Sequence, residues 1–208
     1  ETPLGVSQPV YLQTVVRSQA ELESPVIEIF SRAENSDLWT RHASCQSRPK
    51  DISSHTNEDL HQLQASCTHV HDVKEHYRRL SESGLAYGPA FQTIGELRSS
   101  TQGILARLAV QAAAVSESWI IPPEILDGAF QSLAAISENQ GSDVFVPIGI
   151  ERIVTHGAFG GSAWSYARWR PAGNANQREA DLYLFDDKGS PLAQIEGLKL
   201  RRASRQAM

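Results

Sequence analysis

The chain has 208 residues, of which 40% are hydrophobic and 21% are charged, so it can build one large core or two small ones. Its formal net charge of −5 offers no basic field to nucleic acid, no apolar run is long enough for a membrane span, and no secretory signal is visible. Cys45 and Cys67, the two cysteines, make no disulfide framework. We therefore expect a cytoplasmic protein that has no nucleic-acid or membrane partner.

The first quarter of the chain predicts a small antiparallel sheet without a helix. Residues 9–17, 26–32 and 38–44 are rich in β-branched and aromatic side chains, and polar turns separate them. A three-stranded sheet of this kind has an apolar face that needs a cover, and nothing in residues 1–48 supplies one. We expect the isolated chain to associate through this face, as a homodimer.

A polar stretch follows at residues 49–62, and we interpret it as a linker between two domains. Beyond it, residues 63–70 can form a strand. Residues 72–83 predict a short amphipathic helix, with Asp72 as its N-cap and Gly84 just after its end.

The remaining residues predict one long helix among several strands. The helix is expected over residues 122–141, because two prolines open it and a glycine stands at its end. Its side chains are mostly apolar, so we expect a sheet to wrap around it. Strands are expected at residues 103–110, 144–155, 162–170, 179–186 and 191–201. Since strands and helices do not alternate, the pattern favours an α+β fold with a mostly antiparallel sheet.

Asp127 is the one charged residue inside the apolar part of that helix, and Gln131 lies one turn later on the same face. An acid in this position is hydrogen-bonded, neutralised or used in chemistry. One interpretation is a proton donor whose pKa is raised by burial and whose carboxyl is oriented by Gln131. The other is a structural acid paired with an arginine such as Arg152, with Gln131 a polar residue at the core edge.

Metal and cofactor signals are weak. Cys67, His69 and His71 would share one face of a strand, which resembles metal-ligand spacing, but no fourth ligand is evident. No glycine-rich phosphate loop is present either. We therefore expect neither a metal nor a cofactor.

Several segments, taken together, resemble the dehydratase domains of modular polyketide synthases. Residues 87–92 (YGPAFQ) are similar to the family's Y-G-P-x-F-Q motif, and residues 127–131 (DGAFQ) to its D-x-x-x-Q/H motif. Residues 144–150 (VFVPIGI) resemble its L-P-x-x-(I/V) segment, with valine in place of leucine. An early S-R…W…H-A hairpin at residues 31–43 and the closing strand at residues 195–201 complete the match. Each motif alone is weak, but their order through the whole chain is specific.

The resemblance implies a double hotdog fold, in which two units, each a sheet wrapped around a central helix, stand side by side. Residues 63–208 would be the C-terminal hotdog, which carries the YGP and DxxxQ motifs. Residues 1–48 would be the remnant strands of the N-terminal hotdog, and residues 49–62 the linker.

The resemblance also implies a hydro-lyase that eliminates water from a β-hydroxyacyl chain and leaves an enoyl thioester. The chain would be carried on the phosphopantetheine of an acyl carrier protein, which would be a partner together with neighbouring synthase domains. Asp127 would be the acid, with Gln131 and Tyr87 beside it, although Tyr87 can equally be a packing aromatic in a tight turn. The implied substrate-binding residues are Gly88, Pro89, Phe91, Gly128 and Pro147.

The family's catalytic base is a histidine in an H-x-x-x-G-x-x-x-x-P motif, and no histidine of this chain is followed by the complete motif. The helix that would cover the N-terminal strands is missing too, and the chain starts without Met. We therefore expect a fragment of a dehydratase that is inactive by itself. The alternatives are a related cyclase that forms a pyran ring, a double-bond isomerase, and a non-catalytic structural or acyl-binding module.

Overall fold

The computed structural model describes residues 9–18, 24–48, 58–110, 119–137, 144–171 and 176–203. They belong to two compact units, residues 1–54 and residues 55–208. No helix among these described residues is long and apolar enough to cross a membrane.

The first unit is the predicted three-stranded antiparallel sheet, with the order β1 (Val10–Arg17), β2 (Val26–Ala33) and β3 (Thr40–Gln46). Its register places only uncharged side chains of β1 and β2 on one face, among them Leu12 and Val16, which are 72% and 63% exposed. The opposite face carries Glu28, which accepts hydrogen bonds from Arg17 at 3.0 Å and Arg41 at 2.9 Å. The apolar face expected from the sequence is therefore present, and no helix covers it within the described part of this unit.

The strand β3 begins at Thr40, two residues later than expected. The difference arises in the preceding turn, where the Leu38 N–H donates to Ser36 Oγ at 3.1 Å. This local bond keeps Leu38 out of the sheet.

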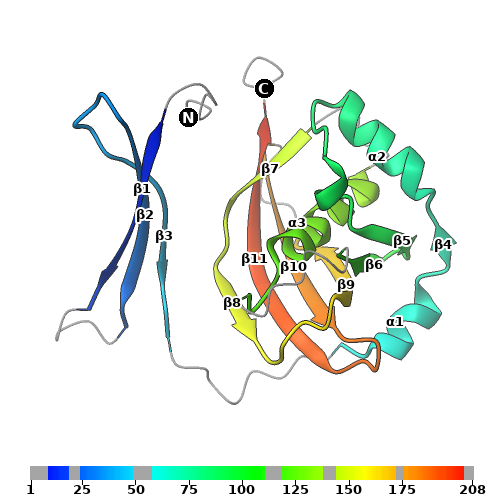
Figure 1. Cartoon of the computed structure of the whole chain (residues 1–208). Helices are drawn as coiled ribbons and strands as arrows, with labels where there is room; N and C mark the ends of the chain where they lie inside the picture. Colours follow the sequence, from blue (N-terminus) through cyan, green and yellow to red (C-terminus); the bar gives the residue numbers. More distant parts are fainter. Residues whose placement is uncertain are drawn as a thin grey trace. The chain divides into compact units, whose positions relative to one another are not determined.

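The second unit is a single antiparallel sheet with helices on it (Figure 1). Its helices are α1 (Leu60–Ser66), α2 (Val73–Glu82) and α3 (Pro123–Ser132), with short 3-10 helices η1 (Pro89–Phe91) and η3 (Leu133–Ser137). Its strands are β4 (His69–Val70), β5 (Ile94–Ser99), β6 (Ile104–Ala109), β7 (Val144–Gly149), β8 (Arg152–Thr155), β9 (Ser162–Trp169), β10 (Gln177–Phe185) and β11 (Pro191–Ala203). The sheet order is β4-β5-β6-β9-β10-β11-β7, and β8 pairs with β11.

The helix α3 lies against the inner face of this sheet, as Figure 1 shows. Ile125, Ala129 and Leu133, spaced four residues apart, are at most 1% exposed and form one face of the helix. They pack with buried side chains of β5, β6, β9, β10 and β11. This arrangement confirms the α+β hotdog architecture, in which an antiparallel sheet wraps around a central helix.

A second, smaller core includes α1 and corrects the expected strand at residues 63–70. Leu60 and Leu63 of α1 and the following Cys67 pack with Leu105, Trp164, Tyr166, Tyr183 and Phe185. Asp59 caps the helix by accepting a hydrogen bond from Gln62 N at 2.9 Å. Only His69 and Val70 form a strand, and the last three residues of the stretch interpreted as a linker belong to this helix.

Two further elements differ from the sequence-based expectation. The single strand predicted at residues 144–155 is two strands, β7 and β8, which pair with different parts of β11. The central helix is α-helical only to Ser132 and continues as the 3-10 helix η3. Its expected end at Gly141 lies outside the described residues.

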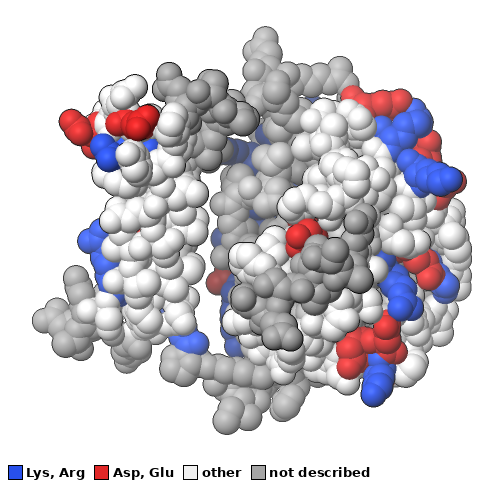
Figure 2. Space-filling model, in the orientation of Figure 1, with Lys and Arg blue, Asp and Glu red and all other residues white. Residues whose placement is uncertain are grey.

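The helix α2 is confirmed together with its ends. The Asp72 side chain accepts from Glu75 N at 3.0 Å, and Gly84 adopts a left-handed conformation with φ of 97°. Acidic and basic side chains lie together on its outer surface (Figure 2). Among them, Glu75 pairs with Arg78 and Arg79. These pairs leave the opposite face of α2 free to contact the sheet and the site described next.

Candidate active site

Asp127 lies in the middle of α3 and is half-buried. Gln131, one turn later, is 4% exposed and donates from Nε2 to Asp127 Oδ2 at 2.6 Å. The same amide nitrogen donates to the Phe91 carbonyl at 3.0 Å. Gln131 therefore holds the carboxyl of Asp127 in a fixed orientation and ties it to the loop before β5.

The electrostatics of Asp127 combine two opposing effects. Burial raises the pKa of the Asp127 carboxyl above its ordinary value, and the hydrogen bond from Gln131 partly offsets this by stabilising the charged form. The net direction is upward, as expected for a carboxylic acid that retains its proton to a higher pH and can donate it.

Two tyrosines lie within electrostatic reach of Asp127. The pKa of Tyr87 is raised to about 12, first by burial, then by the charge of Asp127 and by Tyr77. The pKa of Tyr77 is raised by burial and by Asp127, against a hydrogen bond from the Ile94 N–H at 3.1 Å. Both phenols thus keep their protons at neutral pH.

Tyr77 was missed at the level of sequence. It lies in α2, on the same face as Val73 and Leu80, at the helical spacing of a packing residue. Its position within electrostatic reach of Asp127 depends on how α2 docks on β5, and the only signal in the sequence was a polar hydroxyl on the helix face that also carries Val73 and Leu80.

The Gly88-Pro89 segment forms the start of η1. The Phe91 N–H donates to the Gly88 carbonyl at 3.0 Å, and Gln92 Nε2 donates to the Tyr87 carbonyl at 2.8 Å. These bonds fix the bend after Tyr87. Phe91 reaches the site through its carbonyl oxygen, which accepts from Gln131.

The resemblance implied that Gly128 binds substrate, but the Thr93 side chain lies against this glycine. A Cβ at Gly128 would lie 2.1 Å from Thr93 Oγ1, so the space beside this glycine is already filled. Thr93 is buried and precedes β5.

Pro147 and Arg152 lie on other parts of the sheet. Pro147 is exposed on β7, the last strand in the sheet order, whereas Phe91 and Thr93 precede β5 near the other end. Arg152 of β8 pairs with Glu196 of β11 at 3.4 Å. The alternative in which Arg152 neutralises Asp127 is therefore wrong, because the carboxyl has Gln131 as its partner.

The candidate metal ligands are not gathered into a site. Cys67 is fully buried in the core beside α1, and His71 Nε2 lies 2.8 Å from Ser99 Oγ. Across the described ranges, no three His, Cys, Asp or Glu side chains form a group that could hold a metal ion.

Comparisons with known proteins identify the family of this chain. A family model described as "Polyketide synthase dehydratase N-terminal domain" matches residues 55–208. The polyketide synthase ThaG of Burkholderia thailandensis is 32% identical over 133 residues, which are 64% of this chain and 2% of that protein. The polyketide synthase PksN of Bacillus subtilis is 25% identical over 150 residues, 70% of this chain and 3% of that protein. The chain thus spans only a small part of the relatives it matches.

Among solved structures, the dehydratase domain from the CurK module of the curacin polyketide synthase is 27% identical, with a TM-score of 0.81. The match covers 98% of this chain and 71% of that one. A trans-AT polyketide synthase dehydratase domain from Brevibacillus brevis, 20% identical, shares the fold with a TM-score of 0.84 over 94% of this chain and 70% of its own. Since the family model covers well over half of its length, this chain belongs to the polyketide synthase dehydratase domain family.

Proposed function

We propose that this chain carries the proton donor of a dehydratase site that removes water from a β-hydroxyacyl thioester. The observation that carries the proposal is the half-buried Asp127, oriented by the 2.6 Å hydrogen bond from Gln131. Family membership supports it. Two CurK dehydratase structures, each 26% identical, have an aspartate replaced by asparagine or a histidine by phenylalanine, and both are described as inactive mutants.

In the proposed reaction, a base takes the α-proton of the substrate and the C–O bond at the β-carbon breaks. Protonated Asp127 gives its proton to the departing hydroxide, so the products are water and an enoyl thioester. The raised pKa of Asp127 supports this role, because the carboxyl must be protonated before the step.

We further assign supporting roles around the acid. Tyr87, whose pKa is raised to about 12, offers a neutral hydroxyl to the substrate, while Gly88 and Pro89 set the bend that aims it. Phe91 is 39% exposed and, with Pro147, is proposed to line the path of the acyl chain. Gly128 is not among the proposed substrate-binding residues, because Thr93 fills the space beside it.

The base is proposed to be a histidine outside these 208 residues, since the complete histidine motif is absent from the sequence. The matched region is only 3% of the polyketide synthase PksN and 2% of ThaG, which supports neighbouring synthase domains and an acyl carrier protein as partners. The reaction as written needs no cofactor, and phosphopantetheine enters only as the carrier of the substrate.

Replacing Asp127 by Asn in the synthase polypeptide that contains this chain tests the proposal. We expect dehydration to fall by about 10²–10⁴-fold, the usual contribution of a general acid, with folding retained. Asp72→Asn is the matched control, because asparagine caps a helix as well as aspartate and Asp72 lies at the start of α2. Mass spectrometry of the carrier-bound product gives the readout. Unchanged turnover in Asp127→Asn would mean that Asp127 has a structural role. A cyclic ether as the wild-type product would indicate a cyclase instead of a dehydratase, and a shifted double bond would indicate an isomerase.

A further inference from the structure

Thr93 contacts α3 at the turn that precedes Asp127. It is 4% exposed, and its Oγ1 donates to the Glu124 carbonyl oxygen at 3.1 Å. This bond joins the segment before β5 to the first turn of α3.

Gly128, the residue after Asp127, is shaped to receive Thr93. A Cβ at this position would meet Thr93 Oγ1 at 2.1 Å, while the next atoms, Leu108 Cδ2 at 3.4 Å and Thr93 Cβ at 3.5 Å, would be at ordinary contact distances. Gly128 is not among the glycines with positive φ. A glycine is therefore needed here because there is no room for a Cβ, and not because of the backbone conformation. A single oxygen atom of Thr93 therefore decides whether a side chain fits at residue 128.

Two more hydrogen bonds hold the segment that contains Thr93. The Phe91 carbonyl accepts from Gln131 at 3.0 Å, and the Ile94 N–H donates to the Tyr77 hydroxyl at 3.1 Å. The segment is thus fixed to α3 on one side and to α2 on the other. If α3 moves away from Thr93, the bond from Gln131 to Phe91 lengthens, and the Gln131 amide loses the second partner that helps to fix its orientation toward Asp127.

We propose that Thr93 and Gly128 form a matched pair that positions Asp127, with Thr93 acting as a positioning residue for the acid. The consequence for the reaction rests on the proposed role of Asp127 as proton donor. The pairing itself rests only on the packing and hydrogen bonds around residue 128.

Three variants in the synthase polypeptide that contains this chain test the pair. Gly128→Ala introduces the clash, and we expect kcat to fall on the order of 100-fold with a smaller change in KM, because misplacement by about 1 Å can cost that much. The double variant Thr93→Ala/Gly128→Ala removes the oxygen and should recover most of the loss. Thr93→Ser/Gly128→Ala keeps the oxygen, so it should remain as slow as Gly128→Ala alone. The two double variants differ chiefly in that oxygen.

A titration of Asp127 in the 208-residue chain gives a readout that needs no turnover. Carbon-13 NMR of the Asp127 carboxyl should show its pKa rise further in Gly128→Ala, because Gln131 without Phe91 donates less well to Asp127 and the hydrogen bond from Gln131 lowers this pKa in the wild type. Thr93→Ala/Gly128→Ala should return it toward the wild-type value, whereas Thr93→Ser/Gly128→Ala should not.

Equal recovery in both double variants, or wild-type kcat and titration in Gly128→Ala, would overturn the pair. If Asp127→Asn keeps full turnover while the titration follows the expected pattern, the pair stands and the proposed function fails. The two failures are therefore distinguishable.

Discussion

At the scale of single residues, burial and a hydrogen bond shift the pKa of Asp127 in opposite directions. Apolar packing raises the pKa of its carboxyl, and Gln131 lowers it by stabilising the charge. The same hydrogen bond sets the orientation of the carboxyl. A proton donor needs both properties, since it must hold its proton and point it at the leaving group.

The raised pKa of Asp127 predicts a specific dependence of stability on pH. The ordinary value is 3.8, and the folded-state value is higher, so between the two the folded chain binds more protons than the unfolded chain. Stability contributed by this group is present below pH 3.8 and is lost as the pH rises through the folded-state pKa. Asparagine does not titrate, so Asp127→Asn does not lose this stability. The free energy of unfolding of the variant minus that of the wild type should therefore increase as the pH rises from 3.8 through the folded-state pKa of Asp127. Urea unfolding of both proteins at a series of pH values measures the difference, and a constant difference across the window would contradict the prediction.

At the scale of elements, β11 changes partner along its length. Its residues Ala193–Glu196 pair with β8, and Lys199–Ala203 pair with β7. Gly197 lies between the two stretches with φ of 60°, and its N–H donates to Asp181 Oδ1 at 3.0 Å, where β10 and β11 shift register. Such a bulge bends a strand and increases its twist, which helps the sheet to curl around α3.

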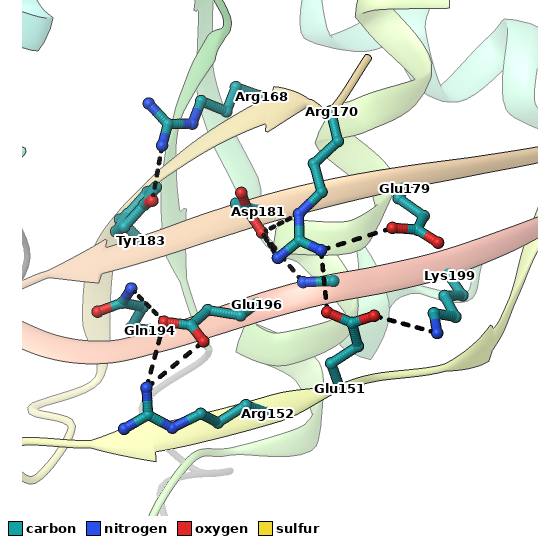
Figure 3. Close-up of polar contacts among 11 residues, drawn as sticks. Glu151, Arg152, Arg168, Arg170, Glu179, Asp181, Tyr183, Gln194, Glu196 and Lys199 are labelled. Carbon is teal, nitrogen blue, oxygen red and sulfur yellow. Dashed lines mark hydrogen bonds and ion pairs between the residues drawn. The ribbon is translucent and has the colours of Figure 1, made fainter. Parts of the chain in front are cut away.

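A group of ion pairs surrounds this bulge (Figure 3). Arg170 contacts Asp181 at 2.8 Å and Glu151 at 2.9 Å, and Lys199 contacts Glu151 at 3.1 Å. These pairs hold the Glu151 side chain against Gly197. A Cβ at residue 197 would therefore lie only 2.3 to 2.6 Å from three Glu151 atoms.

Gly197→Ala is therefore expected to destabilise the second unit. The left-handed conformation alone costs an alanine about 1–2 kcal/mol, and displacement of Glu151 adds to it. Thermal or urea unfolding measures the loss. Glu151→Ala/Gly197→Ala should recover only the steric part. Gly95→Ala is the control, because its Cβ would meet nothing closer than the Arg107 carbonyl oxygen at 3.9 Å and its φ is not positive. Equal effects of Gly197→Ala and Gly95→Ala would contradict this account.

At the scale of the whole molecule, the two units differ in how far they bury their apolar surface. The second unit contains both hydrophobic cores, one on each face of its sheet. The first unit is a sheet whose described residues include no covering helix, and Leu12 and Val16 are largely exposed on it. An exposed apolar sheet face favours association.

We expect the 208-residue chain to associate as its concentration rises, and sedimentation velocity measures this. Leu12→Lys places a charge on the apolar face and should weaken association. Gln13→Lys, on the opposite face of β1, is the matched control and should leave association unchanged. A compact monomer at every concentration would contradict this expectation.

Sequence reasoning succeeded where neighbours along the chain decide the structure. The caps of α2 at Asp72 and Gly84 follow from residue type and spacing, and so does the meeting of Asp127 with Gln131 one turn apart. The alternating strands of the first unit were also found, because the period of side chains in a strand is local. The motif order then identified the family that the comparisons support.

What the sequence by itself determined was thus the α+β hotdog class, the central helix and the Asp127–Gln131 pair. Only the tertiary structure decided that residues 60–66 form a helix, since a short apolar segment becomes helix or strand according to the surface that buries it. It likewise decided that Tyr77 lies near Asp127 and that Thr93 fills the space at Gly128, 35 positions along the chain. The physical reason is that helix periodicity and capping act within a few residues, whereas burial and steric fit are set by segments that meet only when the sheet closes around α3.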